Sequence, residues 1–261
     1  MDVIVEVSII IVTYNSSHII HDCLQNISKL NRCEIIFIDN NSDDNTPDLI
    51  ENAGYNVVKQ DTNIGFANAA NKGALLAHGD LLCFLNPDCE ITQDVCDMAI
   101  SELENNLVNC AVPNYFDGKK LIYGRQPGYT SIKIIADMFE NHPYIHYGSN
   151  MLKLLPFYND YSWYWPIAAC LFIPRQTFFL INCFSEKYFM YLEDVELGFN
   201  LSSIGGNIIT INKSVKHIGG MSSNISNYER IRHLNKSRIL FAENYYNKII
   251  QLIVNLINKL F

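Results

Sequence analysis

The chain has 261 residues, of which 49% are hydrophobic, and these values predict one globular domain, or one domain with a small appendage. The formal net charge of −8 at pH 7 argues against a general nucleic-acid binder, because affinity for a phosphate backbone comes from clustered Lys and Arg. The eight cysteines form no CxxC pair and lie mostly inside apolar segments, which favours reduced core thiols over a zinc site or a disulfide framework.

The amino-terminal residues do not have the pattern of a signal peptide. The first apolar run, residues 7–12, is too short, and the acidic Asp2 and Glu6 precede it. We therefore expect a mature amino terminus and a cytoplasmic protein.

Short β-branched runs alternate with helix-length segments in the first half of the chain. The runs cover residues 8–12, 34–38, 56–58 and 81–85. Continuous apolar runs of this length are typical of strands buried on both faces of a parallel sheet. They predict an α/β layer that binds a nucleotide.

Polar residues follow three of these runs, at residues 13–16, 39–43 and 86–88. In an open parallel sheet, ligands bind beyond the carboxyl ends of the strands, so the three clusters predict one site. Asp39 directly follows a buried run, and its carboxylate could accept hydrogen bonds from ribose hydroxyls or a base N–H. The alternative, an Asx turn or a cap, suits Asp43 or Asp44 better.

Asp88 lies in the turn Asn86-Pro87-Asp88, after the fourth run. A diphosphate leaving group needs charge neutralisation, which Mg²⁺ or Mn²⁺ supplies through one or two carboxylates and phosphate oxygens. Asp88 is therefore the predicted metal ligand, although acidic turns are also common without a metal.

The stretch between about residues 140 and 166 is rich in aromatic side chains. Flat rings can stack on the C–H faces of sugars, so the stretch predicts a carbohydrate acceptor groove beside the donor site. The alternative is that these rings belong to the core. They are Tyr144, Tyr147, Phe157, Tyr158, Tyr161, Trp163, Tyr164 and Trp165.

Three elements are expected next: a strand over residues 168–173, a helix over residues 195–204 and a strand over residues 207–211. Glu193 and Asp194 open the helix. They could supply the general base that takes a proton from an acceptor hydroxyl, or they could cap the helix. His217 precedes a Gly-Gly pair, and its imidazole could ligate a metal, contact a phosphate or have a structural role.

Two features lie near the carboxyl end. A basic cluster could bind an anion or form a solvated helix face. Residues 245–261 predict an amphipathic helix that is too short to span a bilayer, which needs about 20 residues. This helix suits an interface with a membrane or a partner, or docking on its own domain. The basic cluster comprises Arg230, Arg232, His233, Lys236 and Arg238.

In order along the chain, six segments resemble the family 2 inverting glycosyltransferases of the GT-A fold, especially the rhamnosyltransferase-like branch. The resemblance covers nearly all of residues 7–245, and each motif is modest alone. Its carriers are SIIIVTYN (residues 8–15), IDNNSD (38–43), NIGFANAAN (63–71), LNPD (85–88), YLEDVE (191–196) and HIGG (217–220).

The resemblance implies a donor site. At the matching positions, Thr13, Tyr14 and Asp39 would surround the nucleoside, and Gly65 and Asn68 would line the donor pocket. The donor implied by the branch is dTDP-L-rhamnose, and UDP-hexoses remain open because no residue can be named that recognises the sugar.

The resemblance also implies the catalytic machinery. Asp88 would bind Mg²⁺ or Mn²⁺, with His217 near the metal or the diphosphate. Glu193 and Asp194 match the acidic pair that holds the catalytic base, with Asp194 preferred. The sequence departs from the family at Asp88-Cys89-Glu90, where Asp-x-Asp is usual, so the metal contact could rest on Asp88 alone.

The expected fold is a GT-A, Rossmann-like α/β domain with a mostly parallel sheet flanked by helices. Residues 1–240 would form it, with 1–112 binding the nucleotide sugar and 113–240 the acceptor, and 241–261 would form the C-terminal amphipathic helix. The expected reaction is a single displacement, in surface polysaccharide synthesis of the bacterial type. Its acceptor is a glycan or a lipid-linked glycan, and the C-terminal helix would let the protein lie on the inner face of the membrane.

Particular residues oppose two alternative functions. A sugar-phosphate nucleotidyltransferase needs a Gly-rich, basic loop after the first strand, and residues 13–16 contain neither feature. A catalytically inactive module that binds nucleotide sugars or glycans is opposed by the presence of Asp88, Asp194 and His217.

Overall fold

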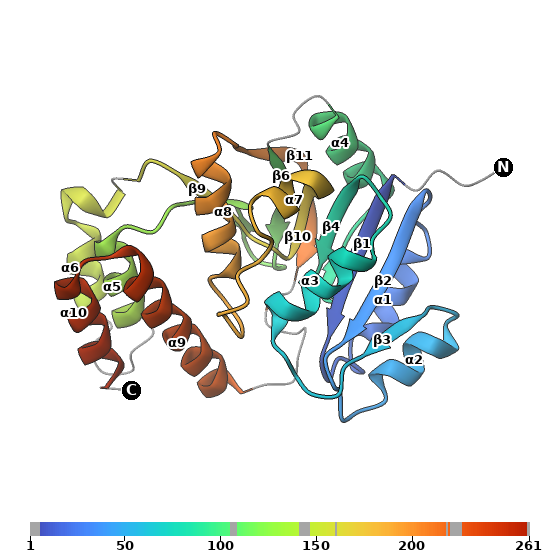
Figure 1. The fold of residues 1–261 in the computed structure, drawn as a ribbon, viewed down its shortest axis with the longest axis horizontal. Helices are drawn as coiled ribbons and strands as arrows, with labels where there is room; N and C mark the ends of the chain where they lie inside the picture. The colour runs from blue at the N-terminus through green and yellow to red at the C-terminus, as the bar shows by residue number, and fades with distance from the viewer. Residues whose placement is uncertain are drawn as a thin grey trace.

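A curled nine-stranded sheet lies at the centre of the computed structural model, which describes residues 6–104, 109–140, 147–159, 161–217, 219 and 226–259 (Figure 1). The strand order is β3-β2-β1-β4-β10-β6-β11-β5, and β7 pairs with β6. The first four strands in the sequence are parallel neighbours. They are β1 (Val7–Thr13), β2 (Cys33–Asp39), β3 (Val57–Lys59) and β4 (Leu81–Leu85), each within two residues of the predicted run.

The second half of the sheet is mixed rather than parallel. β10 pairs antiparallel with both β4 and β6, whereas β11 runs parallel to β6 and antiparallel to β5. The predicted strand at 168–173 is β10, and the one at 207–211 continues to residue 217 as β11. These strands are β5 (Cys89–Glu90), β6 (Cys110–Phe116), β7 (Leu121–Ile122), β10 (Cys170–Pro174) and β11 (Ile208–His217). A separate ribbon joins β8 (Arg125–Pro127) to β9 (Tyr164–Pro166).

Helices cover both faces of the sheet, as the alternation of side chains along β1 requires. Ile9 and Ile11 pack with α1 and α4 on one face, whereas Ile10 packs with α3, α7 and α8 on the other. Gly73 of α3 permits close packing, since a Cβ there would lie 2.4 Å from Ile10 Cγ2. These helices are α1 (Ile20–Ile27), α2 (Thr46–Asn52), α3 (Phe66–Leu76), α4 (Gln93–Leu103), α7 (Arg175–Leu180) and α8 (Glu193–Ser203).

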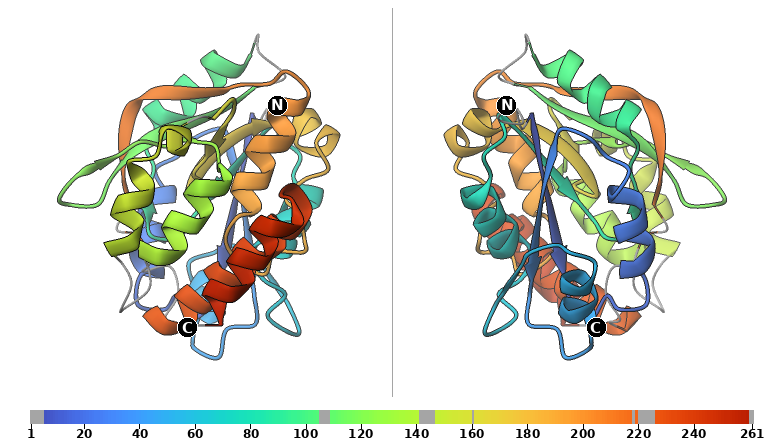
Figure 2. Two further views of the ribbon diagram at one scale, coloured as in Figure 1. Left: turned by 90° about the vertical axis from the view of Figure 1, so that its left-hand side faces the viewer. Right: turned by 90° about the vertical axis from the view of Figure 1, so that its right-hand side faces the viewer.

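A third hydrophobic cluster lies at the end of the molecule away from β3, where four more helices gather (Figures 1 and 2). Buried Phe241, Val254 and Met138 join these helices, and Tyr188 and Val195 connect the cluster to the segment around α8. The helices are α5 (Ser131–Glu140), α6 (Tyr147–Lys153), α9 (Asn227–Tyr245) and α10 (Lys248–Asn258).

The C-terminal helix begins later than predicted. The sequence pattern predicted one helix from residue 245, but α9 continues to Tyr245 and α10 starts at Lys248. The break occurs because Asn247 has extended backbone angles and its side chain accepts hydrogen bonds from the N–H groups of Ile249 and Ile250 at 3.1 Å. Within the described ranges, no helix combines the length and hydrophobicity needed to cross a bilayer.

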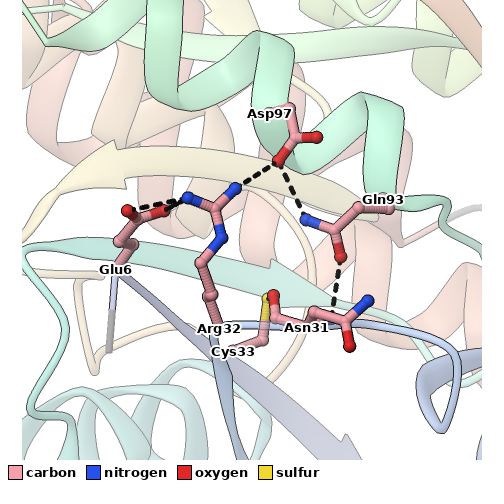
Figure 3. A network of polar contacts seen from close by, with 6 residues as sticks. All are labelled: Glu6, Asn31, Arg32, Cys33, Gln93 and Asp97. Carbon is pink, nitrogen blue, oxygen red and sulfur yellow. Dashed lines mark hydrogen bonds and ion pairs between the residues drawn. The ribbon is translucent and has the colours of Figure 1, made fainter. Parts of the chain in front are cut away.

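An exposed polar network ties the α1–β2 turn to α4 (Figure 3). Arg32 donates to Glu6 at 3.0 Å and to Asp97 at 3.1 Å, and Gln93 both donates to Asp97 and accepts from the N–H of Asn31. All eight cysteines are free and six are buried, as predicted for core thiols.

Candidate active site

Thr13 and Asp39 end adjacent parallel strands and face each other in register. Thr13 Oγ1 donates to Asp39 Oδ1 at 2.8 Å, and Ser42 donates to the same carboxylate through its Oγ at 2.6 Å and its N–H at 2.9 Å. Asp39 is only 1% exposed. The Asp39 carboxylate therefore connects the end of β1 to the loop after β2. A hydrogen bond from a nucleoside would have to use the lone pairs of its oxygens that Thr13 and Ser42 leave unused.

The loop after β1 is tied to the loop after β2. Asn15 adopts a left-handed conformation with φ 50°, its N–H donates to Ser42 Oγ, and its Oδ1 accepts from the N–H of Asp43 at 2.8 Å. Tyr14 precedes it and is half-buried. These bonds fix the backbone on which Tyr14 is displayed.

Gly65 directly precedes α3 and Asn68 lies in its first turn, and both contact the segment that leads to the acidic pair. Gly65 has φ 83°, and a Cβ there would lie 2.4 Å from Phe189 O, so only glycine permits this approach. The next N–H, of Phe66, donates to Phe189 O at 2.8 Å. Asn68 Nδ2 donates to the backbone oxygen of Glu186 at 3.4 Å.

Asp88 and His217 meet through the pairing of β5 with β11, in which Cys89 is opposite His217. Asp88 Oδ1 lies 3.4 Å from His217 Nε2, and the two side chains are 1% and 15% exposed. Glu90 is not part of this pair, because its carboxylate forms an exposed ion pair with Lys216. The departure from the Asp-x-Asp pattern therefore leaves Asp88 as the acidic group at this position.

The chemistry of this pair fits a divalent cation. A carboxylate oxygen and an imidazole nitrogen are both ligands for Mn²⁺, and both atoms are buried. Three or more His, Cys, Asp or Glu side chains do not converge on a metal position anywhere in the described part of the chain. A metal held by Asp88 and His217 would take its other ligands from substrate and water.

Glu193 and Asp194 form the first turn of α8, and their surroundings differ. Asp194 accepts hydrogen bonds from the N–H groups of Val195 at 2.9 Å and Ala168 at 3.4 Å, whereas Glu193 Oε2 is buried without a hydrogen bond. Burial raises the pKa of Asp194 to about 6, and burial together with the Asp194 charge raises that of Glu193 well above its ordinary value. With a pKa of about 6, Asp194 is mostly ionised at neutral pH, whereas Glu193 is harder to ionise than an exposed carboxyl group.

The turn before the acidic pair is strained. Tyr191 and Leu192 have φ of 70° and 66°, a region that residues with a Cβ rarely occupy. Ser237 of α9 holds this turn, since its Oγ donates to Met190 O at 2.7 Å. The acidic pair is therefore positioned from both sides, by α3 through Phe189 and by α9 through Met190.

A cavity of about 260 Å³ joins residues that lie far apart in the sequence. It brings together the acidic pair and His217, and it adds Arg230 and the backbone around Ala168. Thr13, Asp39 and Asn68 are not among its walls. The lining residues are Phe66, Asn86, Ile167, Ala168, Ala169, Met190, Tyr191, Glu193, Asp194, His217 and Arg230.

Two parts of this wall were not among the predicted site residues. The 167–169 segment carries no polar side chain, and only its position opposite α8 makes it part of the site. Arg230 belonged to a cluster for which binding and solvation were equally favoured, and the structure separates it from its exposed neighbour Arg232.

The aromatic side chains of the 140–166 stretch that the structure describes are half-buried and pack against neighbouring elements. Trp165 Nε1 donates to Pro127 O at 3.0 Å, and Trp163 contacts Phe199 edge to face. Tyr144 lies outside the described residues. None of the described rings of this stretch lines the cavity, so the predicted acceptor groove stays a prediction.

Comparison with known proteins identifies several similar to this chain. The model of the family described as "Glycosyl transferase family 2" matches residues 8–167. EpsH of Bacillus subtilis (strain 168), which is named as a glycosyltransferase, is 27% identical over 54% of the chain and 41% of its own length. Poly-beta-1,6-N-acetyl-D-glucosamine synthase of Staphylococcus aureus (strain COL) is 36% identical over 34% of the chain and 23% of its own length.

The fold also matches solved structures. The mannosyltransferase PcManGT from Pyrobaculum calidifontis, solved with GDP-Man and Mn²⁺, superposes with a TM-score of 0.61 at 15% identity. The match covers 98% of this chain and 69% of that one. The chain spans less than half the length of the two curated relatives.

Proposed function

The chain belongs to glycosyl transferase family 2, and on this basis we propose that it transfers a sugar from a nucleotide-diphosphate donor to an acceptor hydroxyl, with inversion at the anomeric carbon. One observation carries the proposal: the carboxyl group of Asp194 shares a cavity with His217, whose imidazole lies 3.4 Å from Asp88. The cavity thus contains a base for an acceptor and lies beside a place for a diphosphate.

The proposed reaction is a single displacement. Asp194 takes the proton of the acceptor hydroxyl, whose oxygen attacks the anomeric carbon as the bond to the diphosphate breaks. One attack from the face opposite the leaving group inverts the configuration. The pKa of about 6 supports this role, because the carboxylate is ionised at neutral pH and is more basic than an exposed one.

Asp88 and His217 are the proposed ligands of Mg²⁺ or Mn²⁺. The ion would neutralise charge on the diphosphate. The buried oxygen and nitrogen at this position support the assignment, as does the presence of Mn²⁺ with GDP-Man in the mannosyltransferase of similar fold.

The donor site is proposed at the carboxyl ends of the first strands. Thr13, Tyr14 and Asp39 would surround the nucleoside, with Gly65 and Asn68 nearer the sugar. The position of β1 between β2 and β4 supports this, because it puts Thr13 between Asp39 and the turn of Asp88. The proposed donor is dTDP-L-rhamnose or a UDP-hexose.

The proposed acceptor is a glycan or a lipid-linked glycan in polysaccharide synthesis. Similarity to a poly-beta-1,6-N-acetyl-D-glucosamine synthase supports a carbohydrate product. The C-terminal helix is the proposed membrane contact, because Ile249, Leu252 and Leu256 of α10 are 70%, 60% and 53% exposed.

The test is transfer itself. The protein is incubated with a panel of nucleotide sugars and candidate acceptors, and products are identified by mass spectrometry, with Asp194→Asn as the matched inactive control. Transfer or slow donor hydrolysis that the control lacks supports an enzyme. Donor binding without either reaction in the wild type would instead indicate an inactive binding module.

A further inference from the structure

Arg230 is the one arginine or lysine in the wall of the catalytic cavity, among the residues that the structure describes. We propose that its guanidinium binds the diphosphate of the donor and stabilises the charge that grows there as the glycosidic bond breaks. The proposal rests on the proposed function and adds a residue from α9, which lies beyond the part of the chain that matches the family model.

The start of α9 is fixed, so Arg230 projects from a defined place. Ser226 and Glu229 form a capping box: Ser226 Oγ accepts from the N–H of Glu229 at 3.2 Å, and Glu229 Oε2 accepts from the N–H of Ser226 at 3.0 Å. Arg230 is the fourth residue of the helix. It lies at the end of the helix dipole that carries partial positive charge, which adds to the attraction for an anion.

Contacts along α9 hold Arg230 in a constant relation to the acidic pair. One turn after Arg230, the ring of His233 stacks on Phe189 with centroids 4.8 Å apart, and Ser237 Oγ donates to Met190 O. Phe189 and Met190 belong to the strained turn that ends at Glu193. The base and the guanidinium are therefore positioned by the same turn.

Charge in the cavity favours an anionic ligand for Arg230. A nucleotide sugar brings about two negative charges, and it enters beside the carboxylates of Asp88 and Asp194. As the bond from the anomeric carbon to the diphosphate oxygen breaks, its electron pair stays on that oxygen, and the acceptor proton passes to Asp194. The leaving group thus gains one negative charge, which a permanently charged guanidinium stabilises by paired hydrogen bonds to phosphate oxygens.

An alternative role for Arg230 is to contact an anionic group on the acceptor. The position of His217 in the same wall, with its imidazole 3.4 Å from Asp88, favours the diphosphate. Arg230 and Tyr191 line the same cavity, and the Arg230 charge opposes the rise that burial causes in the pKa of the Tyr191 phenol.

The experiment compares Arg230→Gln with Arg232→Gln, a matched change at an exposed position of the same helix. Calorimetry in Mn²⁺ measures the affinity of each protein for UDP, UMP and uridine. The same measurement is made with dTDP, dTMP and thymidine. We expect Arg230→Gln to weaken diphosphate binding about 10- to 100-fold, the loss of one charged hydrogen-bonding group, with nucleoside binding unchanged. Arg232→Gln should bind all ligands as the wild type does, and Arg230→Lys should recover part of the loss.

Three outcomes overturn the proposal, and they can be told apart. Wild-type diphosphate affinity in Arg230→Gln, with transfer lost and acceptor KM raised, would assign Arg230 to the acceptor. If Arg230→Gln and Arg232→Gln weakened nucleoside diphosphate binding equally, the loss would be due to the general surface charge of α9 and not to a contact from Arg230. Failure of the wild type to bind either nucleoside diphosphate would refute the proposed function itself. A circular dichroism melt of each variant shows whether a loss is due to unfolding.

Discussion

Asp194 and Glu193 are adjacent in sequence, yet their surroundings differ: the N–H groups of Ala168 and Val195 donate to Asp194, whereas burial and the Asp194 charge raise the pKa of Glu193 well above its ordinary value. We predict that Asp194→Asn lowers kcat by roughly 10² to 10⁴ with donor affinity nearly intact, because the amide keeps the shape but cannot take a proton. Steady-state kinetics and calorimetry check this. Glu193→Gln is the control, and a larger loss of turnover there than in Asp194→Asn would move the base by one residue.

The pKa of Asp194 also sets a pH dependence. Only the ionised carboxylate can take a proton, so kcat/KM should decrease tenfold per pH unit below about pH 6 and level off above it. The pH profile of transfer measures this. A profile that is flat between pH 5 and 7 would contradict Asp194 as the base.

The same buried charge should cost stability. The folded-state pKa of Asp194 is raised from 3.8 to about 6, so ionisation penalises the folded state, fully above pH 6 and hardly at all below pH 4. Asp194→Asn removes this penalty, and we expect its free energy of unfolding at pH 8 to exceed that of the wild type by about 1 to 3 kcal/mol. Urea unfolding at pH 8 and pH 4 checks both the gain and its disappearance in acid.

The sequence predicted the types of the site residues better than their partners. The pattern identified Asp88 and His217 separately, but their 3.4 Å contact depends on the pairing of two short strand segments far apart in the chain. The sequence could not show whether Glu90 binds the metal for the same reason, since its ion pair with Lys216 depends on that strand pairing. Asp39 was expected to face a ligand, and no local pattern could show how Thr13 and Ser42 already bind its oxygens.

At the scale of elements, α10 has two different apolar surfaces. Val254 and Ile257 are buried in the third cluster, whereas Ile249, Leu252 and Leu256 are exposed. We predict that changing the three exposed residues to Gln reduces co-sedimentation with anionic vesicles and leaves the melting temperature nearly unchanged. The control is Leu75→Gln with Leu180→Gln, which removes equally exposed leucines from α3 and α7. Equal vesicle binding by both variants would leave α10 without a membrane role.

The sequence alone could not predict which apolar residues of α10 are buried and which are exposed. Its periodicity showed a wide apolar face but not which part of that face docks on α5 and α9. For this reason, deleting the helix is a poor test of membrane contact, because it would also expose Phe241 and Met138. β1, β2 and β4 were predictable because buried parallel strands are continuous apolar runs, whereas β3 is a three-residue edge strand whose side chains are half-buried or exposed. The short β5, β7, β8 and β9 were not, because their pairing comes from distant segments.

At the scale of the whole molecule, the proposed metal joins the two halves of the sheet, since Asp88 follows β4 and His217 ends β11. We predict that Mn²⁺ strengthens the binding of a nucleoside diphosphate, and that EDTA abolishes the gain. Calorimetry with and without chelator measures this, with Asp88→Asn as the variant that should no longer respond to Mn²⁺. Equal affinity and equal turnover in EDTA would remove the metal from the mechanism.

The position of β10 has a consequence for how the chain folds during synthesis. β10 lies between β4 and β6, so β6 cannot join the sheet until the later residues Cys170–Pro174 have been made. The four parallel strands can form early, but β6 and its attached β7 must wait with the edges that pair with β10 and β11 open. Slow translation before residue 170 would lengthen that wait, and substitutions that weaken β10 should therefore reduce the yield of folded protein more than they reduce the stability of what has folded.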